Sequence, residues 1–289
     1  MSKDLNLIKD LRETTGAGFV DCKNALSESN NDVDKAIDYL RKKGLSKANK
    51  KSSREAKDGI VSINIYNESK EATIIEINSE TDFAAKNIEF INFVKKTNDL
   101  IKEFKSFNDF SDLNNTATSN LKDNLNNIIS KIGENIVIRR FSKITAQNNE
   151  KIYGYVHNKY DNNIGKIACL LKVKANKYDD KTNELLRQIC MHISALKPIS
   201  LSIDSLDKNI IDKEKEILME GIKSSGKPEN IINNILKGKI NKFYEEVVLL
   251  EQKFIIDNET KIKNILNEYS KNNNNLIQII DYKLFVLGN

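Results

Sequence analysis

The side chains most able to carry out chemistry are few in this sequence, and their spacing matches no catalytic or metal-binding pattern. There are two histidines, His157 and His192, and three cysteines, Cys22, Cys169 and Cys190. Nucleophilic catalysis needs a serine or cysteine held beside a base, and no such set stands out. The cysteines share no metal-ligand spacing. We therefore predict reduced, buried thiols and a chain without enzymatic chemistry, metal or cofactor.

The two histidines are expected in different settings. His157 stands at the end of a predicted strand, whereas His192 lies between Met191 and Ile193 in a predicted helix. The apolar neighbours favour a packed or hydrogen-bonded His192.

Residues 221–227 spell most of a phosphate-binding loop, Gly-Ile-Lys-Ser-Ser-Gly-Lys. In that motif a serine or threonine follows the lysine to hold Mg²⁺, and a strand leads into the loop. Here Pro228 takes the hydroxyl position, and a helical pattern precedes the loop. Because proline suits the first turn of a helix, we predict a turn between two helices and no direct nucleotide binding.

Residues 76–86, Glu-Ile-Asn-Ser-Glu-Thr-Asp-Phe-Ala-Ala-Lys, lead from an apolar strand through an acidic loop into a predicted long helix. Thr81 or Asp82 can cap that helix, because a short side-chain oxygen accepts a hydrogen bond from a free backbone N–H. Phe83 and Phe90 are seven residues apart, which places both on one helical face and favours burial of Phe83. The alternative is a rigid corner that presents an aromatic ring and a carboxylate to another molecule.

The composition is that of a soluble globular protein with one large domain or two to three small ones. The chain has 289 residues, of which 39% are hydrophobic and 30% charged. Its net charge of +5 does not by itself mark a nucleic-acid binder. No apolar run approaches the roughly 18 residues of a membrane span, and the charged first residues do not form a signal peptide. We therefore expect a cytoplasmic protein without membrane contact.

Residues 1–45 are predicted to form a small three-helix module. Glycines within residues 15–18 separate the first two helices, because glycine tolerates positive φ, and Gly44 is predicted to end the third. Residues 46–58 then turn basic and polar, which predicts a solvated linker or a linker helix. Such cations can also contact phosphate groups, although no aromatic residues interleave to stack on bases.

From residue 59 the apolar pattern changes from helical to alternating spacing. Residues 59–142 predict a β-hairpin, two helices and a strand. Residues 143–204 and 244–289 repeat the order of hairpin, polar loop and helix, with a strand predicted at residues 247–250. The repetition predicts two related halves of one core.

Residues 205–243 carry two helical patterns joined by a short turn, which predicts an inserted antiparallel helical hairpin. The predicted fold class is therefore α+β, with an N-terminal three-helix module, two related α+β core halves and this hairpin.

Three segments resemble the translation elongation factor Ts family. Residues 11–26, Leu-Arg-Glu-Thr-Thr-Gly-Ala-Gly-Phe-Val-Asp-Cys-Lys-Asn-Ala-Leu, resemble its N-terminal signature, and residues 76–86 resemble its second signature with a Thr-Asp-Phe core. Residues 131–136, followed by Arg139 and Arg140, look like a further family segment. The order of the modules is also similar, and the resemblance implies that the N-terminal module is UBA-like.

The resemblance implies a guanine-nucleotide exchange factor, not an enzyme, that binds the GDP form of the GTPase elongation factor Tu. The residues it assigns to the Mg²⁺ and nucleotide region of the GTPase are Thr81, Asp82, Phe83, Ala84, Lys86, Ile132 and Gly133. The residues it assigns to docking are Arg12, Phe19, Val20 and His157. It associates the helical hairpin with further partner contact or a homodimer. We expect Asp82 to cap and orient the corner while Phe83 acts as a wedge.

One departure and two alternatives stand beside this interpretation. Ala84 replaces the valine that is common in the family, which removes apolar bulk behind Phe83. The main alternative function is an RNA- or ribosome-associated protein that uses the basic residues 41–57. A third hypothesis is a helical module, residues 1–45, that recognises other proteins generally.

Overall fold

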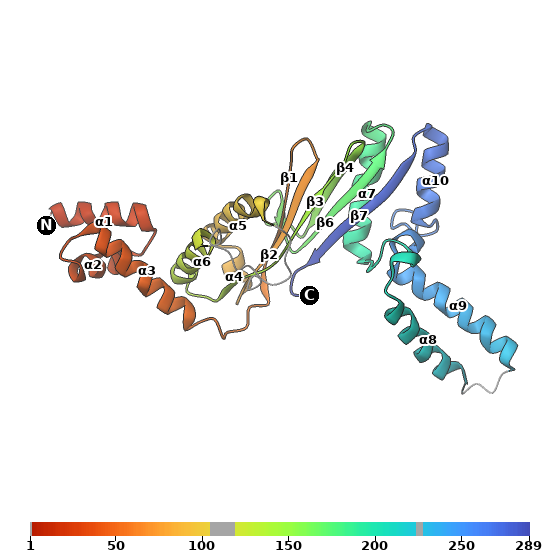
Figure 1. The fold of residues 1–289 in the computed structure, drawn as a ribbon, viewed down its shortest axis with the longest axis horizontal. Helices are drawn as coiled ribbons and strands as arrows, with labels where there is room; N and C mark the ends of the chain where they lie inside the picture. Colours follow the sequence, from red (N-terminus) through yellow and green to blue (C-terminus); the bar gives the residue numbers. More distant parts are fainter. Residues whose placement is uncertain (1, 105–118, 224–227) are drawn as a thin grey trace.

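The computed structural model describes residues 2–104, 119–223 and 228–289. A helical module lies at one end, two antiparallel sheets with their helices form the middle, and a pair of long helices projects at the other end (Figure 1). This mixture confirms the predicted α+β class. In the part of the chain that is described, no helix is both long and apolar enough to cross a membrane.

The N-terminal module consists of helices packed around a small apolar core. The helices are α1 (Ser2–Thr15), α2 (Phe19–Glu28) and α3 (Val33–Asn49). Leu11, Cys22 and Ala36 are fully buried between them. Asp32 caps α3, because its Oδ1 accepts a hydrogen bond from the Lys35 backbone N–H at 3.1 Å.

The third helix is longer than predicted, because it passes through Gly44 and ends at Asn49. Glycine inside a helix costs about 0.5–1 kcal/mol relative to alanine. The continuation buries Ala48, which is 5% exposed, in the apolar core of the neighbouring half. Tertiary packing thus outweighs the local stop signal, and the linker predicted at residues 46–58 begins inside a helix.

The first half of the core is an antiparallel sheet with helices on one face. Its elements are β1 (Asp58–Tyr66), β2 (Glu71–Ser79), α4 (Asp82–Ala85), α5 (Ile88–Leu100), the 3-10 helix η1 (Ile101–Glu103), α6 (Ser119–Ile132), β3 (Ile136–Thr145) and β5 (Ile164–Gly165). The strand order is β3-β2-β1-β5. β1 and β2 form the predicted hairpin, and Phe90 of α5 packs with Phe141 of β3 in the same core.

The second half repeats this arrangement with its own sheet, in the order β4-β6-β7. Its elements are β4 (Glu150–His157), β6 (Ile167–Ala175), α7 (Asp180–Leu196), the 3-10 helix η4 (Ile203–Ser205), α10 (Ile262–Asn273) and β7 (Ile277–Val286). α7 and α10 pack against one face of this sheet around Leu171, Ile189 and Leu266.

The two sheets meet through their other faces, so β1 and β2 are buried on both sides. Ile63 and Ile74 of the first sheet share an apolar cluster with Ile152 and Leu170 of the second. Gly154 permits this close approach, because a Cβ there would lie 2.6 Å from the Ile63 Cδ1. Burial on both faces explains the nearly continuous apolar runs of β1 and β2.

A helical hairpin projects beyond the second half (Figure 1). Its arms are α8 (Lys208–Lys223) and α9 (Glu229–Val247). Residues 224–227, which include part of the predicted turn, lie outside the described residues.

The strand predicted at residues 247–250 is wrong. The chain continues α9 to Val247 and then forms the 3-10 helix η5 (Leu249–Glu251). The predicted end of the hairpin at residue 243 therefore comes too early. A short apolar run fits a buried helical segment as well as a buried strand, and Val248 is fully buried here.

Candidate functional site

The helical segment that follows β2 is broken after its first turn. α4 contains four residues, Asp82–Ala85, and its C-terminal cap is Lys86. Asn87 then caps α5, because its side-chain oxygen accepts a hydrogen bond from the Glu89 backbone N–H at 2.8 Å. The predicted long helix is therefore two helices.

This break separates Phe83 from Phe90. The Phe83 side chain is 81% exposed, whereas Phe90 is 0% exposed. The prediction that helical periodicity buries Phe83 is wrong, because the two residues do not share a helix. Ala84, the next residue of α4, is buried. Among the residues assigned to partner contact, Ala84 is one that the fold covers.

Thr81, and not Asp82, caps α4. The Thr81 Oγ1 accepts a hydrogen bond from the Ala84 backbone N–H at 3.3 Å. Asp82 is the first helical residue, and its carboxylate pairs with the Lys86 ammonium group at 2.7 Å. This hydrogen bond lowers the pKa of Asp82 and raises the pKa of Lys86. The same ammonium group lies 6.0 Å from the centre of the Phe83 ring, within cation–π range.

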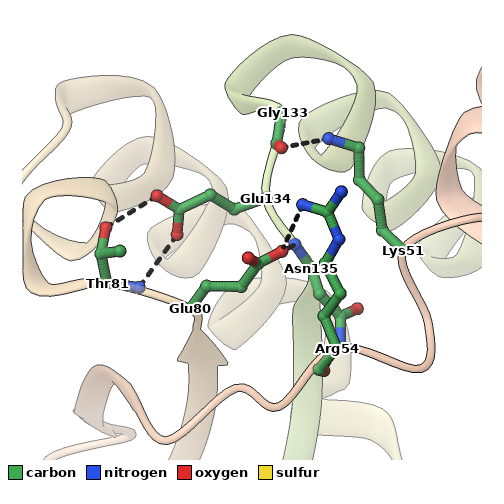
Figure 2. A network of polar contacts seen from close by, with 7 residues as sticks. All are labelled: Lys51, Arg54, Glu80, Thr81, Gly133, Glu134 and Asn135. Carbon is green, nitrogen blue, oxygen red and sulfur yellow. Dashed lines mark hydrogen bonds and ion pairs between the residues drawn. The ribbon is translucent and has the colours of Figure 1, made fainter.

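Glu134 holds the cap residue from the opposite side (Figure 2). Its carboxylate accepts hydrogen bonds from the Thr81 backbone N–H at 3.0 Å and from the Thr81 hydroxyl at 2.7 Å. Because the single hydroxyl proton goes to Glu134, the same oxygen can accept the bond from Ala84. Gly133, with a φ of +86°, ends α6 immediately before Glu134. Ile132 is half-buried against the first core.

The basic segment after α3 supports the corner from a third direction (Figure 2). The Lys51 ammonium group donates a hydrogen bond to the Gly133 carbonyl oxygen. The Arg54 guanidinium lies 3.5 Å from the Glu80 carboxylate. Glu80 also accepts a hydrogen bond from the Asn135 backbone N–H at 2.6 Å, and Asn135 Nδ2 donates to the Arg54 carbonyl oxygen at 2.7 Å. Three segments distant in sequence therefore meet directly beside α4.

These contacts change the interpretation of the basic residues 41–57. Lys51 and Arg54 contact oxygen atoms of the protein, and Arg41 forms an ion pair with Asp123 of α6. A cation that already has a carboxylate or carbonyl partner gains less from a phosphate group. The structure therefore gives these three side chains a role in joining segments of the fold.

The residues assigned to docking lie on other surfaces. Phe19 and Val20 are 45% and 66% exposed at the start of α2, and Arg12 is exposed near the end of α1. His157 is exposed at the end of β4. α2 and the strands of the second half lie on opposite sides of the first half (Figure 1). The residues assigned to the Mg²⁺ and nucleotide region thus lie together at one corner. The docking residues lie on two separate exposed surfaces, one on the N-terminal module and one at the end of β4.

Of the histidine and cysteine side chains, all but the exposed His157 are buried in the fold. His192 is buried with its Nε2 3.0 Å from Gln252 Oε1, as the sequence predicts, and burial lowers the pKa of His192. The three cysteines are also buried. Within the described ranges, no group of three His, Cys, Asp or Glu side chains is placed to hold a metal ion.

Sequence reasoning missed the side chains that support the corner. Glu134, Glu80 and Arg54 are each one charged residue among many, and their partners are 26 or more positions away. Only one weak feature of the sequence points to Glu134 as a supporting residue. It follows a glycine at a predicted helix end, where the direction of the chain is fixed.

Comparison with known proteins agrees with the resemblance. The profile of the family described as Elongation factor TS matches residues 80–289. The chain is 38% identical over 290 residues to elongation factor Ts of Ehrlichia chaffeensis and 37% identical to that of Ehrlichia ruminantium strain Welgevonden, with 100% of both chains covered in each case. It is 40% identical over 285 residues to elongation factor Ts of a Nitratiruptor species, which covers 97% of this chain and 92% of that one.

The profile match begins after β2 and covers the corner, the rest of the first half, the second half and the helical hairpin. The full-length relatives add the N-terminal module, the linker and the hairpin of β1 and β2. The chain therefore belongs to the elongation factor Ts family of translation elongation factors.

Proposed function

We propose that this protein binds the GDP form of the GTPase elongation factor Tu and promotes release of GDP and its exchange for GTP. The observation that carries the proposal is the exposure of Phe83, 81%, at a corner supported by polar contacts. An exposed phenylalanine contributes little to folding, but it gains free energy when a partner covers it.

The proposed mechanism is a disturbance of the Mg²⁺ and phosphate site of the GTPase. Such GTPases hold nucleotide and Mg²⁺ with a lysine, a hydroxyl and backbone N–H groups in fixed geometry. Phe83, inserted beside this site, displaces those groups slightly and weakens the bonds to GDP. The Asp82 carboxylate enters with its charge paired to Lys86, which reduces its repulsion from the phosphates.

The effects of GDP and of this protein on each other's binding to the GTPase are reciprocal. If the protein weakens GDP binding by a given free energy, then GDP weakens binding of the protein by the same amount. Rebinding of nucleotide to the GTPase therefore expels the exchange factor. This scheme requires no catalytic side chain, metal or bound nucleotide in the chain itself.

The remaining assigned residues have docking roles in this proposal. Arg12, Phe19 and Val20 place the N-terminal module on the nucleotide-binding domain of the GTPase, and the strand that ends at His157 contacts its third domain. The hairpin of α8 and α9 provides further partner contact or a homodimer.

The test is the rate at which labelled GDP leaves elongation factor Tu in excess unlabelled nucleotide. Catalytic amounts of this protein should accelerate release in proportion to its concentration, and each molecule should act repeatedly. A release rate equal to that of the GTPase alone would reject the proposal. A heat-denatured sample of the same protein is the matched control for added protein mass.

A further inference from the structure

The segment between the N-terminal module and the first sheet makes closer contacts than a solvated linker requires. Lys51 follows the end of α3, and Arg54 lies in the loop before β1. Both side chains turn toward the segments that surround α4 (Figure 2). Their targets are oxygen atoms of Gly133 and Glu80.

One set of contacts leads from Lys51 to the cap of α4. Lys51 donates to the carbonyl oxygen of Gly133, which has positive φ and fixes the direction in which the next residue leaves α6. That next residue is Glu134, whose carboxylate accepts both the backbone N–H and the hydroxyl proton of Thr81. A change at Lys51 therefore reaches Thr81 through two bonded residues.

A second set of contacts closes a ring around the same loop. Arg54 contacts the Glu80 carboxylate at 3.5 Å through its guanidinium, and its carbonyl oxygen accepts from Asn135 Nδ2 at 2.7 Å. Asn135 in turn donates its backbone N–H to Glu80 at 2.6 Å. Asn135 is 4% exposed, so this ring is shielded from water on one side, where hydrogen bonds are stronger.

Cations balance two of the three carboxylates at this corner. Glu80 and Asp82 lie close to Phe83 in the chain, and Glu134 reaches the same loop through Thr81, on a surface proposed to approach phosphate groups. Asp82 is paired with Lys86, and Glu80 with Arg54. Without such partners, the carboxylates would repel both one another and the phosphates.

We infer that Lys51, Arg54 and Glu134 are positioning residues for the corner formed by residues 81–86. They hold Thr81 and α4 so that Phe83 faces the GTPase. This inference rests on the proposed function and adds residues that act through Thr81 and not by touching the partner. It also assigns the basic segment a purpose, because its cations fix the corner relative to the docking module that precedes it.

The test separates positioning from binding by comparing Lys51→Met, Arg54→Met and Glu134→Ala with the unchanged protein. GDP release is measured at rising concentrations of each variant, which yields a maximal rate and a half-saturating concentration. Loss of a hydrogen bond made by a charged group should lower the maximal rate by about tenfold in Lys51→Met and Glu134→Ala. Arg54→Met should lower it by only about threefold, because the contact with Glu80 is 3.5 Å long and the guanidinium is half-exposed. The half-saturating concentration should stay within about twofold, because the docking surfaces are unchanged.

Two further variants provide matched controls. Lys50→Met removes an equal charge from the exposed neighbour of Lys51 and should leave both kinetic values unchanged. Glu134→Gln keeps one side-chain oxygen as an acceptor for Thr81, so it should retain more of the maximal rate than Glu134→Ala. Thermal unfolding of every variant establishes that each is folded at the assay temperature.

A readout without the GTPase makes the inference independent of the proposed function. Hydrogen exchange of the Ala84 amide, which bonds to Thr81, should become faster in Lys51→Met and Glu134→Ala but not in Lys50→Met. Unchanged Ala84 exchange, or a loss confined to the half-saturating concentration, would overturn the inference. If the unchanged protein fails to accelerate GDP release, the proposed function falls, while the Ala84 amide still decides whether these residues hold the corner.

Discussion

Both halves of the core pass from a strand through a polar loop into a helix, but the two corners present different surfaces. In the first, Thr81 caps the four-residue α4, and Phe83 is 81% exposed. In the second, Asp179 caps the 17-residue α7. The aromatic residue there, Tyr178, turns back, and its hydroxyl donates to the Asn149 carbonyl oxygen at 2.8 Å. The shared topology therefore does not force an aromatic ring outward.

The difference arises where each helix continues or stops. In α7, Leu185, Leu186 and Ile189 extend one apolar face over the second sheet without interruption. In the first half, Asn87 starts a new helix by capping Glu89, which releases Phe83 from the apolar face of α5. Asparagine is favoured at such a cap because its short side chain competes for backbone N–H groups.

The largest expected effect separates two phenylalanines of the first half. Phe90→Ala should lower the free energy of unfolding by about 3–5 kcal/mol, because it leaves a cavity in a packed core. Phe83→Ala should change that free energy by no more than about 0.5 kcal/mol, since the ring is exposed. Urea unfolding of both variants provides the measurement. Equal destabilisation would mean that Phe83 packs in the core of the free protein.

A smaller effect compares the two helix caps. Thr81→Ala and Asp179→Ala should each lower the free energy of unfolding by about 1 kcal/mol, because each leaves a backbone N–H of the first helical turn without its partner. Thr81→Ala should also slow GDP release, whereas Asp179→Ala should not, because α7 does not carry the exposed ring.

Thr81→Ser serves as the control for this pair of caps, since it keeps the hydroxyl that bonds Glu134 and the Ala84 N–H. It should restore both stability and release. If Asp179→Ala slowed release as much as Thr81→Ala, then the distinction between the two corners would fail.

The smallest effect concerns the acids of the two corners. The pKa of Asp82 is lowered chiefly by the hydrogen bond from Lys86, and that of Asp179 chiefly by the Thr182 backbone N–H. A carboxyl group with a lowered folded-state pKa stabilises the protein above its unfolded pKa of about 3.9 and loses that contribution as pH falls through the folded value. Lys86→Met should therefore raise the pKa of Asp82 and leave that of Asp179 unchanged.

Carboxyl carbon chemical shifts followed by NMR between about pH 6 and about pH 2 report both groups in one titration. A parallel rise at Asp82 and Asp179 would indicate a general electrostatic effect of losing one cation. An unchanged Asp82 would show that the ion pair with Lys86 is not formed in solution.

Local patterns were sufficient to predict most of the elements. Isoleucine-rich segments on either side of a polar turn predict the hairpin of β1 and β2, and helical spacing predicts α6 with its end at Gly133. Errors arose where tertiary contacts outweighed local signals. α3 continues past Gly44 because Ala48 is buried in the core of the first half. Val248 is apolar because it is buried, and that apolar residue made a helical segment resemble a strand in the sequence. Neither contact can be inferred from neighbouring residues.

In the candidate site, too, local patterns predict one part and tertiary contacts decide the other. Its exposed members lie in one continuous stretch, residues 81–86, that sequence reasoning found. Its supports do not: Glu134 reaches Thr81 across 53 positions, and Asn135 reaches Arg54 across 81. Helical periodicity predicts burial of Phe83 only for an unbroken helix, and the cap at Asn87 breaks that helix.

The central claim is that Phe83 acts on the GTPase and not on the core of its own protein. The most direct measurement is the rate of labelled GDP release from elongation factor Tu with the unchanged protein, Phe83→Ala and Leu276→Ala. Leu276 is an exposed apolar residue, 64%, whose carbonyl oxygen bonds Asn176 at the second corner. Phe83→Ala should lower the acceleration by roughly 30-fold or more, as expected for a central contact worth at least about 2 kcal/mol, while Leu276→Ala should not. Full acceleration by a folded Phe83→Ala protein would contradict the account.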